Sequence, residues 1–190
     1  MMQIITAFDE SILLFLQDNV RFGFLNALMR GVTSLGNVGI VWIVVSVLFL
    51  CFRRYRKCGI VMISALLLCT LINTVILKNL FQRPRPFEGI PELMVLIKRP
   101  SGFSFPSGHA STSFACALVL MSMEKKFAVP GLILAALIAF SRVYVGVHYA
   151  TDVIAGAVVG IISGIIVCWA YRRFFEGKLF AHEGENDGKS

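Results

Sequence analysis

Histidine, serine, arginine and aspartate occur together in three short stretches of this chain, in spacings that suit phosphate chemistry. In the last stretch, 141–152 (SRVYVGVHYATD), His148 and Asp152 lie four residues apart and Arg142 closes the preceding apolar run. This spacing places His148 and Asp152 on one face if the backbone is near-helical. A carboxylate that accepts one imidazole N–H fixes the tautomer and leaves the other nitrogen with a free lone pair. The alternative interpretation is an aspartate helix cap with an incidental histidine nearby.

The stretch 104–113 (SFPSGHASTS) precedes an apolar run and has the residue types of a helix start. Ser107 follows a proline and suits the N-cap position, and Gly108 lets a ligand approach the backbone closely. The first amides of a helix are unpaired and attract anions. A titratable His109 at this position is therefore a functional candidate, although the stretch could also be no more than a serine-rich cap.

The stretch 78–86 (KNLFQRPRP) lies where an apolar run gives way to a loop. Lys78 supplies a point charge and Arg85 a planar fork, which together complement the oxygens of a phosphate. An ordinary lysine that reaches the membrane surface, beside basic residues that anchor on lipid headgroups, explains the same pattern without a substrate.

The elements that must position these residues are apolar helices. Of 190 residues, 57% are hydrophobic and 15% are charged, whereas soluble domains carry about 25% charged residues. We predict a single membrane-embedded domain, 1–190, with no signal peptide and with a disordered polar tail at 180–190. The five cysteines are scattered through apolar segments, so we interpret them as small hydrophobic residues rather than disulfides or metal ligands.

The predicted fold is an all-α integral membrane bundle, because a span needs roughly 20 apolar residues. The N-terminal segment Phe8–Leu35 is apolar but interrupted by charges, so it is either a sixth span or an interfacial helix pair. We favour a short interfacial helix followed by a span from about Val20. The five clear spans are Gly36–Phe52, Cys58–Phe81, Ser107–Met123, Phe127–Tyr144 and Asp152–Tyr171.

The topology follows from the basic loops. Alternating spans place three basic clusters on one side of the membrane, which the positive-inside rule makes cytoplasmic. The net charge of +7 is therefore explained largely by these loops, and we expect no nucleic-acid partner. The loop 82–106 and the turn 145–151 then lie together on the outer side. These outer segments also carry several cations, which the positive-inside rule does not explain. We take them to indicate an anionic substrate. The three clusters are Arg53, Arg54, Arg56 and Lys57; Lys125 and Lys126; and Arg172, Arg173 and Lys178.

The three stretches together resemble the signature of the type 2 phosphatidic acid phosphatase family, which shares its site with vanadium haloperoxidases. The resemblance consists of Lys-x6-Arg-Pro, Pro-Ser-Gly-His and Ser-Arg-x5-His-x3-Asp in the family's order, and it covers most of the chain from Lys78 to Asp152. It implies a membrane lipid phosphatase that works through a phosphohistidine. The segments before Lys78 and after Asp152 are similar to the family only in being helical and apolar.

The resemblance also implies a role for each matching residue. His148 would be the nucleophile, Asp152 would hold its tautomer, and His109 would protonate the leaving group and then activate water. We expect no metal or other cofactor, because few carboxylates lie near the outer loop to bind one. The predicted phosphate-binding residues are Lys78, Arg85, Ser107, Gly108 and Arg142.

The identity of the lipid is left open by the sequence, as are the oligomeric state and the organism. The apolar middle of the outer loop, 93–97, suggests contact with a lipid tail or the membrane surface, or else a packed lid. Small members of the family lead us to undecaprenyl diphosphate in a bacterial inner membrane, with phosphatidylglycerophosphate or phosphatidic acid as the alternative. Some dedicated undecaprenyl diphosphate phosphatases carry aspartate where Gly108 stands, which counts against the first choice. Two other classes are a transporter, which needs polar residues through the depth of several spans, and a purely structural or lipid-binding membrane protein.

Overall fold

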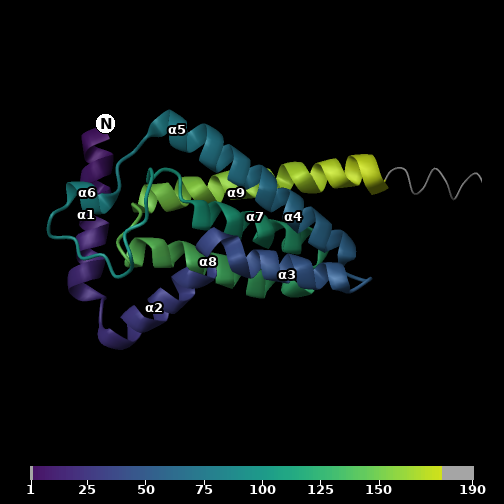
Figure 1. Cartoon of the computed structure of the whole chain (residues 1–190), viewed down its shortest axis with the longest axis horizontal. Coiled ribbons are helices and arrows are strands. Elements are labelled where there is room, and N and C mark those ends of the chain that lie inside the picture. The colour runs from purple at the N-terminus through teal and green to yellow at the C-terminus, as the bar shows by residue number, and fades with distance from the viewer. Residues whose placement is uncertain (1, 177–190) are drawn as a thin grey trace, which may run out of the picture.

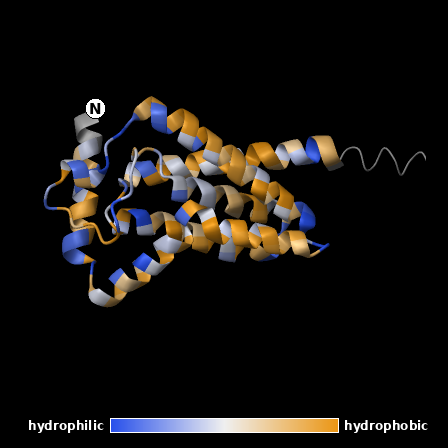
Figure 2. Cartoon of the chain, in the orientation of Figure 1, coloured by the Kyte–Doolittle hydropathy of each residue, from blue (hydrophilic) through white to orange (hydrophobic). Residues whose placement is uncertain are grey.

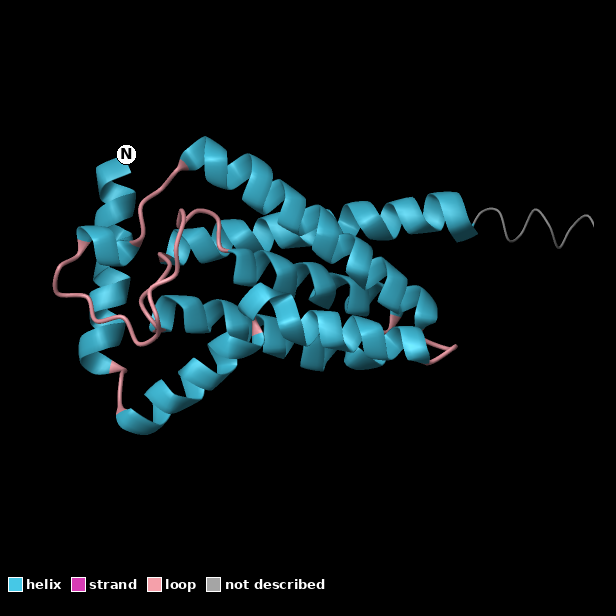
Figure 3. Cartoon of the chain, in the orientation of Figure 1, coloured by secondary structure: helices cyan, strands magenta, loops and turns pink. Residues whose placement is uncertain are grey.

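The computed structural model describes residues 2–176, and most of them are helical (Figure 3). No strand occurs within this part of the chain, so the all-α prediction is confirmed. The predicted tail at 180–190 lies outside the described residues, as does Lys178. The elements are α1 (Met2–Asn19), α2 (Gly23–Leu35), η1 (Asn37–Gly39), α3 (Ile40–Cys51), α4 (Arg56–Leu71), η2 (Ile72–Leu77), α5 (Lys78–Phe81), α6 (Pro86–Gly89), α7 (Gly108–Met123), η3 (Lys125–Phe127), α8 (Ala128–Tyr144), α9 (Ala150–Tyr171) and η4 (Arg172–Glu176).

The long helices run together as a bundle, and α1 lies across one end of it (Figure 1). Helix α7 is the centre of the bundle, because it packs against α4, α8 and α9. Its buried side chains join those of the neighbouring helices in one core that includes Trp42, Met62, Val119 and Ile138. The five cysteines are free, and four of them are buried, as expected for small hydrophobic residues.

The outer faces of the bundle are apolar. Hydrophobic residues dominate the long helices, and polar segments gather mainly at the two ends (Figure 2). Large side chains such as Leu67, Val129 and Ile154 are more than half exposed. Exposed apolar surface of this extent is typical of helices in contact with lipid. The chain is therefore a multi-pass membrane protein.

Three helical segments are long and apolar enough to cross a membrane, namely Arg56–Gly89, Lys125–Tyr144 and Ala150–Phe175. The pair Gly23–Leu35 and Asn37–Cys51, which is bent by 49°, would form a fourth span. The predicted span Gly36–Phe52 is thus one arm of this broken pair. The predicted span Ser107–Met123 corresponds to a shorter apolar helix, α7. The count of five or six spans stays a prediction.

Helix α1 and the outer loop cover the end of the bundle. Leu13 of α1 packs against Ile90 and Leu93 of the loop and against Val143 and Tyr149 of the bundle. The loop residues 95–97 pack in a second cluster with the turn after α8. Most of the loop's apolar middle is therefore packed against the protein, as in the lid interpretation, although Met94 is 65% exposed.

Helices α7 and α9 run parallel and touch through their backbones. A Cβ atom added at Gly156 would lie 2.5 Å from the carbonyl oxygen of Ser107, and one added at Gly160 would clash with that of Ser111. Small residues spaced by four allow such an approach between helices in a membrane. The contact brings the N-terminal ends of α7 and α9 side by side, which are the ends that carry the second and third sequence motifs.

Replacing Gly160 by alanine should destabilise the fold, because the clashing atoms belong to the backbone of α7 and cannot rotate away. We expect a loss of about 1–3 kcal/mol, seen as a lower unfolding temperature of the detergent-purified protein. Gly31→Ala on α2 is the matched control, since nothing lies within 4 Å of a Cβ at that position. Equal unfolding temperatures of the two variants would contradict the backbone contact.

Candidate active site

The second and third motifs are joined by a backbone hydrogen bond. The amide of Ser107 donates to the carbonyl oxygen of Asp152 over 3.0 Å, so the start of α7 is tied to the first turn of α9. Ser107 occupies the N-cap position as predicted, but its hydroxyl makes no capping hydrogen bond. The predicted N-cap position is therefore correct, but the interpretation of this stretch as a serine cap needs correction, because the Ser107 hydroxyl does not cap α7.

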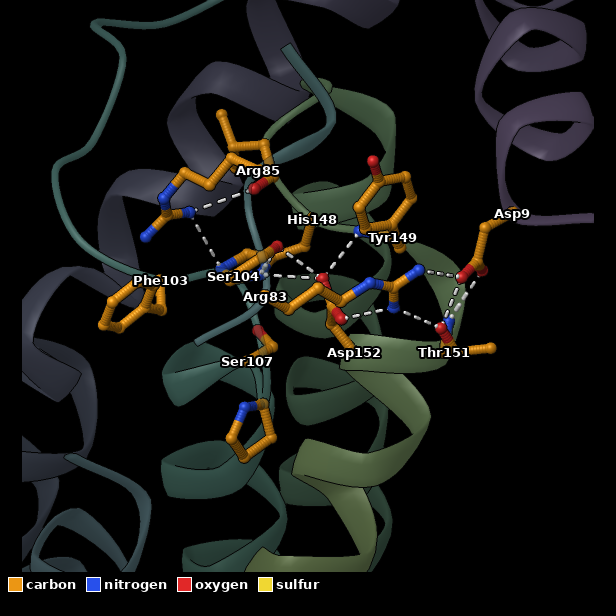
Figure 4. Close-up of polar contacts among 12 residues, drawn as sticks. Asp9, Arg83, Arg85, Phe103, Ser104, Ser107, His148, Tyr149, Thr151 and Asp152 are labelled. Atoms are coloured by element: carbon orange, nitrogen blue, oxygen red, sulfur yellow. Dashed lines mark hydrogen bonds and ion pairs between the residues drawn. The ribbon is translucent and has the colours of Figure 1, made fainter. Parts of the chain in front are cut away.

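His148 contacts Asp152 through a serine (Figure 4). Its Nδ1 atom lies 3.6 Å from Asp152 Oδ2 and 3.3 Å from the hydroxyl of Ser104. Ser104 in turn donates to Asp152 Oδ2 over 2.5 Å. The three side chains are buried, with exposures of 2% or less. Because Nδ1 faces a hydroxyl and a carboxylate, its proton is held there and the lone pair is left on Nε2.

The opposite side of the imidazole faces Arg85. The Nε2 atom of His148 lies 3.5 Å from Arg85 Nη1. Arg85 is only 4% exposed, and carbonyl oxygens of Ser101, Gly102 and Val147 accept its N–H groups. These acceptors are neutral, so they orient the guanidinium without cancelling its charge. A cation and a basic nitrogen side by side suit an incoming phosphate.

Lys78, Gly108 and His109 line a single cavity of about 230 Å³ between η1, η2 and α7. The ammonium group of Lys78 donates to the carbonyl oxygen of Phe103 over 2.8 Å. His109 lies close enough to His148, Arg85 and Arg142 to interact with them electrostatically. The structure thus brings the first and second motifs to one place at the same end of the bundle.

The ring of His109 is held from the break between α2 and α3. Its Nε2 atom lies 3.2 Å from Asn37 Oδ1, and the ring also hydrogen-bonds the backbone of Thr33. The break needs unusual backbone angles, with φ of 54° at Val38 and 70° at Gly39. A β-branched residue at positive φ is rare and strained, and here the strained turn carries the residue that holds His109.

Two predicted phosphate-binding side chains have donors without a partner. Arg142 is 3% exposed and its Nη1 donates to the hydroxyl of Thr33 over 2.7 Å, but its Nε is unpaired. The hydroxyl of Ser107 is likewise buried and unpaired. Buried polar atoms nearly always have partners. In the described part of the chain these two are the only unpaired buried side-chain atoms, and both belong to the predicted anion site.

Several residues of this cluster were not assigned a role from the sequence. Ser104 and Arg83 stand inside the stretches singled out above, so their polarity was the available signal. Asn37 and Asp9 had no such signal, because each lies in a segment that the motifs do not include. Arg83 Nη1 donates to Asp152 Oδ1 over 2.8 Å, so the carboxylate beside His148 is also paired with a cation.

An all-helical membrane bundle with two histidines and several cations gathered at one end is the arrangement expected of a membrane protein that handles phosphate groups. The family model described as the PAP2 superfamily matches residues 58–176. The chain belongs to this superfamily, as the three motifs predicted.

Known relatives agree with this assignment. An undecaprenyl-diphosphatase from Sulfolobus acidocaldarius is 37% identical over 137 residues, which is 72% of this chain and 66% of the relative. The chain therefore spans just under two thirds of the length of this relative. The crystal structure of LpxE from Aquifex aeolicus has a TM-score of 0.71 and 32% identity, and the match covers 80% of this chain and 90% of LpxE. A PAP2-type phosphatidylglycerolphosphate phosphatase from Bacillus subtilis has a TM-score of 0.73 and 25% identity, covering 90% and 88%.

The environment of His148 favours its neutral form. Burial lowers the pKa of His148 to about 4, while the neighbouring carboxylate of Asp152 opposes that decrease. An imidazole in the unfolded chain titrates at about 6.5. Between these two values the unfolded chain binds more protons than the folded chain, so acid in this window favours unfolding.

We therefore expect the His148 resonances to titrate well below pH 6.5 in NMR spectra of histidine-labelled protein. The contribution of His148 to stability should be complete above pH 6.5 and should decline as the pH falls toward about 4. Comparison with His148→Asn isolates this group from other acidic effects. A titration midpoint at or above 6.5 would contradict the buried, neutral imidazole.

Proposed function

We propose that the chain is a lipid phosphatase that transfers a phosphoryl group from a lipid phosphate or diphosphate to His148 and then to water. The observation that carries this proposal is the orientation of His148. Its Nδ1 faces Ser104 and Asp152, whereas its Nε2 faces the guanidinium of Arg85. The free lone pair therefore points to the cation that would hold the phosphate.

In the first step, Nε2 of His148 attacks phosphorus and the bond from phosphorus to the leaving oxygen breaks. Asp152, with Ser104, retains the proton on Nδ1 and stabilises the positive charge that develops on the ring. His109 enters this step as an imidazolium, donates its Nε2 proton to the leaving oxygen and becomes a neutral imidazole. That oxygen would take the place of the Asn37 amide oxygen that now lies 3.2 Å from His109 Nε2.

In the second step, water attacks phosphorus and the phosphorus–nitrogen bond breaks. His109 accepts the proton from water, and inorganic phosphate leaves with the original state of His148 restored. Lys78, Arg85 and Arg142 stabilise the equatorial oxygens in both steps, together with the hydroxyl of Ser107 and the backbone at Gly108. Such prearranged donors typically contribute about 10²–10³ in rate each.

We propose undecaprenyl diphosphate as the substrate. The similarity to an archaeal undecaprenyl-diphosphatase supports this choice, and the similarity to a phosphatidylglycerolphosphate phosphatase supports phosphatidylglycerophosphate as the alternative. The basic clusters lie at the end of the bundle opposite to the site. There the ammonium group of Lys126 donates a hydrogen bond to the hydroxyl of Tyr55, and the guanidinium of Arg172 donates one to the hydroxyl of Ser122. The positive-inside rule then favours a site on the outer face of the cell membrane.

Replacing His148 by alanine should abolish phosphate release, because no other described side chain occupies the position of the nucleophile. The assay is phosphate release by detergent-purified protein, with the unfolding temperature as a check on folding. Residual release near the wild-type rate would remove His148 from the mechanism. If the wild-type protein itself released no phosphate from any lipid, a transporter or lipid-binding protein would become the better description.

The substrate is tested by comparing undecaprenyl diphosphate, phosphatidylglycerophosphate and phosphatidic acid side by side, each with a chelator present. We expect release from all three to survive the chelator, because the proposed steps use imidazoles and side-chain cations. Undecaprenyl diphosphate should give the highest kcat/KM. A strict requirement for magnesium would overturn the mechanism, whereas a preference for phosphatidylglycerophosphate would change only the substrate.

A further inference from the structure

Asp9 of α1 lies outside the three motifs but contacts the residues next to Asp152, namely Thr151 and Arg83. The side chain is fully buried although α1 lies across the end of the bundle (Figure 1). Its Oδ1 atom accepts the amide of Thr151 over 3.0 Å, and its Oδ2 atom accepts the hydroxyl of Thr151. The carboxylate of Asp9 thus sits at the N-terminal end of α9, where a negative charge is favourable.

Arg83 lies between Asp9 and Asp152 (Figure 4). Its Nη2 atom is 2.8 Å from Asp9 Oδ2, and its Nη1 atom is 2.8 Å from Asp152 Oδ1. The guanidinium also stacks on the ring of Tyr149, with 3.9 Å between Cζ and the ring centroid. Both carboxylates have no exposed side-chain surface, whereas Arg83 is 22% exposed. One cation is therefore shared by two buried anions.

The sharing determines how much negative charge Asp152 can direct at His148. The three side chains Asp9, Arg83 and Asp152 carry a formal charge of −1 together. Without Asp9, the charge of Arg83 would be compensated by Asp152 alone and the trio would be neutral. In a buried site, interactions of this kind are weakly screened, so the imidazole would feel the difference.

We propose that Asp9 is a positioning residue of the reaction, which acts through Arg83 to keep Asp152 oriented and negatively charged toward His148. This inference rests on the function proposed above and adds a residue from α1 to the site. It also assigns a role to α1, whose docking completes the charge balance of the cluster. A simple anchor for α1 would use the same contacts but would not depend on the sum of the charges.

Four proteins separate these two explanations, namely the wild type, Asp9→Asn, Arg83→Gln and the double variant. The formal charge of the trio is −1, 0, −2 and −1 in that order. We expect Asp9→Asn to lower kcat on the order of tenfold, as is typical for groups within one polar network, with KM nearly unchanged. The double variant restores the charge, so its kcat should exceed that of either single variant. An anchoring role predicts instead that the double variant is no better than the worse single variant, and that result would overturn the proposal.

The NMR titration midpoint of His148 gives a second readout that needs no activity. It should fall in Asp9→Asn, rise in Arg83→Gln and return toward the wild-type value in the double variant. Asp152 and the other charged groups that act on His148, namely His109, Arg85 and Arg142, are the same in all four proteins. An unchanged midpoint across the series would overturn the coupling through Arg83, even if the wild type proved inactive and the proposed function failed.

Asp18→Asn is the matched control, because it is the same chemical change on the same helix at an exposed position. It should leave kcat and the His148 midpoint at their wild-type values. Asp9→Glu keeps the charge and should retain more activity than Asp9→Asn. Equal losses in Asp9→Glu and Asp9→Asn would indicate that shape rather than charge matters at this position.

Discussion

The close approach of α7 and α9 is the constraint on which the site depends. The glycines of α9 let its backbone touch that of α7 at Ser107 and Ser111, and the two helices run parallel, so both N-terminal ends meet at one end of the bundle. A hydrogen bond from the amide of Ser107 to the carbonyl oxygen of Asp152 fixes their register. Without this contact, the starts of the two helices, which carry His109 and Asp152, would not lie side by side, as the proposed reaction requires. Packing between small residues therefore takes the place of the larger apolar contacts that would separate the helices.

The cations of the candidate site have neutral partners rather than carboxylates. Arg85 and Arg142 are buried, and Lys78 is partly buried. Carbonyl oxygens hold Arg85 and Lys78, and a hydroxyl holds Arg142. Burying a charge with only dipoles as partners is costly, but it leaves the positive potential uncancelled and available to an anion. Arg83 is the exception, since two carboxylates neutralise it. Arg83 therefore compensates the carboxylate beside His148, whereas Arg85 and Arg142 keep an uncompensated charge that the proposed reaction would use to bind phosphate.

Much of this site could be predicted because its motifs are local. The spacing of His148 and Asp152 and the helix start after Ser107 follow from neighbouring residues, and the apolar runs indicated an all-helical membrane bundle. The contribution of α1 could not be predicted, because the pairing of Asp9 with Arg83 joins segments far apart in the sequence and α1 has no motif of its own. The boundary between Leu35 and Gly36 was placed from the sequence, but the geometry of the break at 36–39 was not predicted. An apolar run predicts a span but not the bend of 49° that brings Asn37 to His109.

The N-terminal segment carries charges that a membrane span would avoid, because these charges bind other parts of the protein. Asp9 and Arg21 interrupt an apolar stretch, and each is used at the end of the bundle. Asp9 meets Arg83, and Arg21 donates to the backbone oxygens of Tyr144 and Met94. Leu13 adds an apolar contact with Tyr149, the residue that follows His148. These three side chains hold α1 against the turn that contains His148. Within the hydrocarbon region, irregular backbone is stable only where protein or a water-filled cavity surrounds it. A helix that lies across the end of the bundle contributes to the burial of His148 and Asp152. The charges of Asp9 and Arg21 disfavour a membrane-spanning position for this segment, and the same charges bind it to the end of the bundle that contains the site.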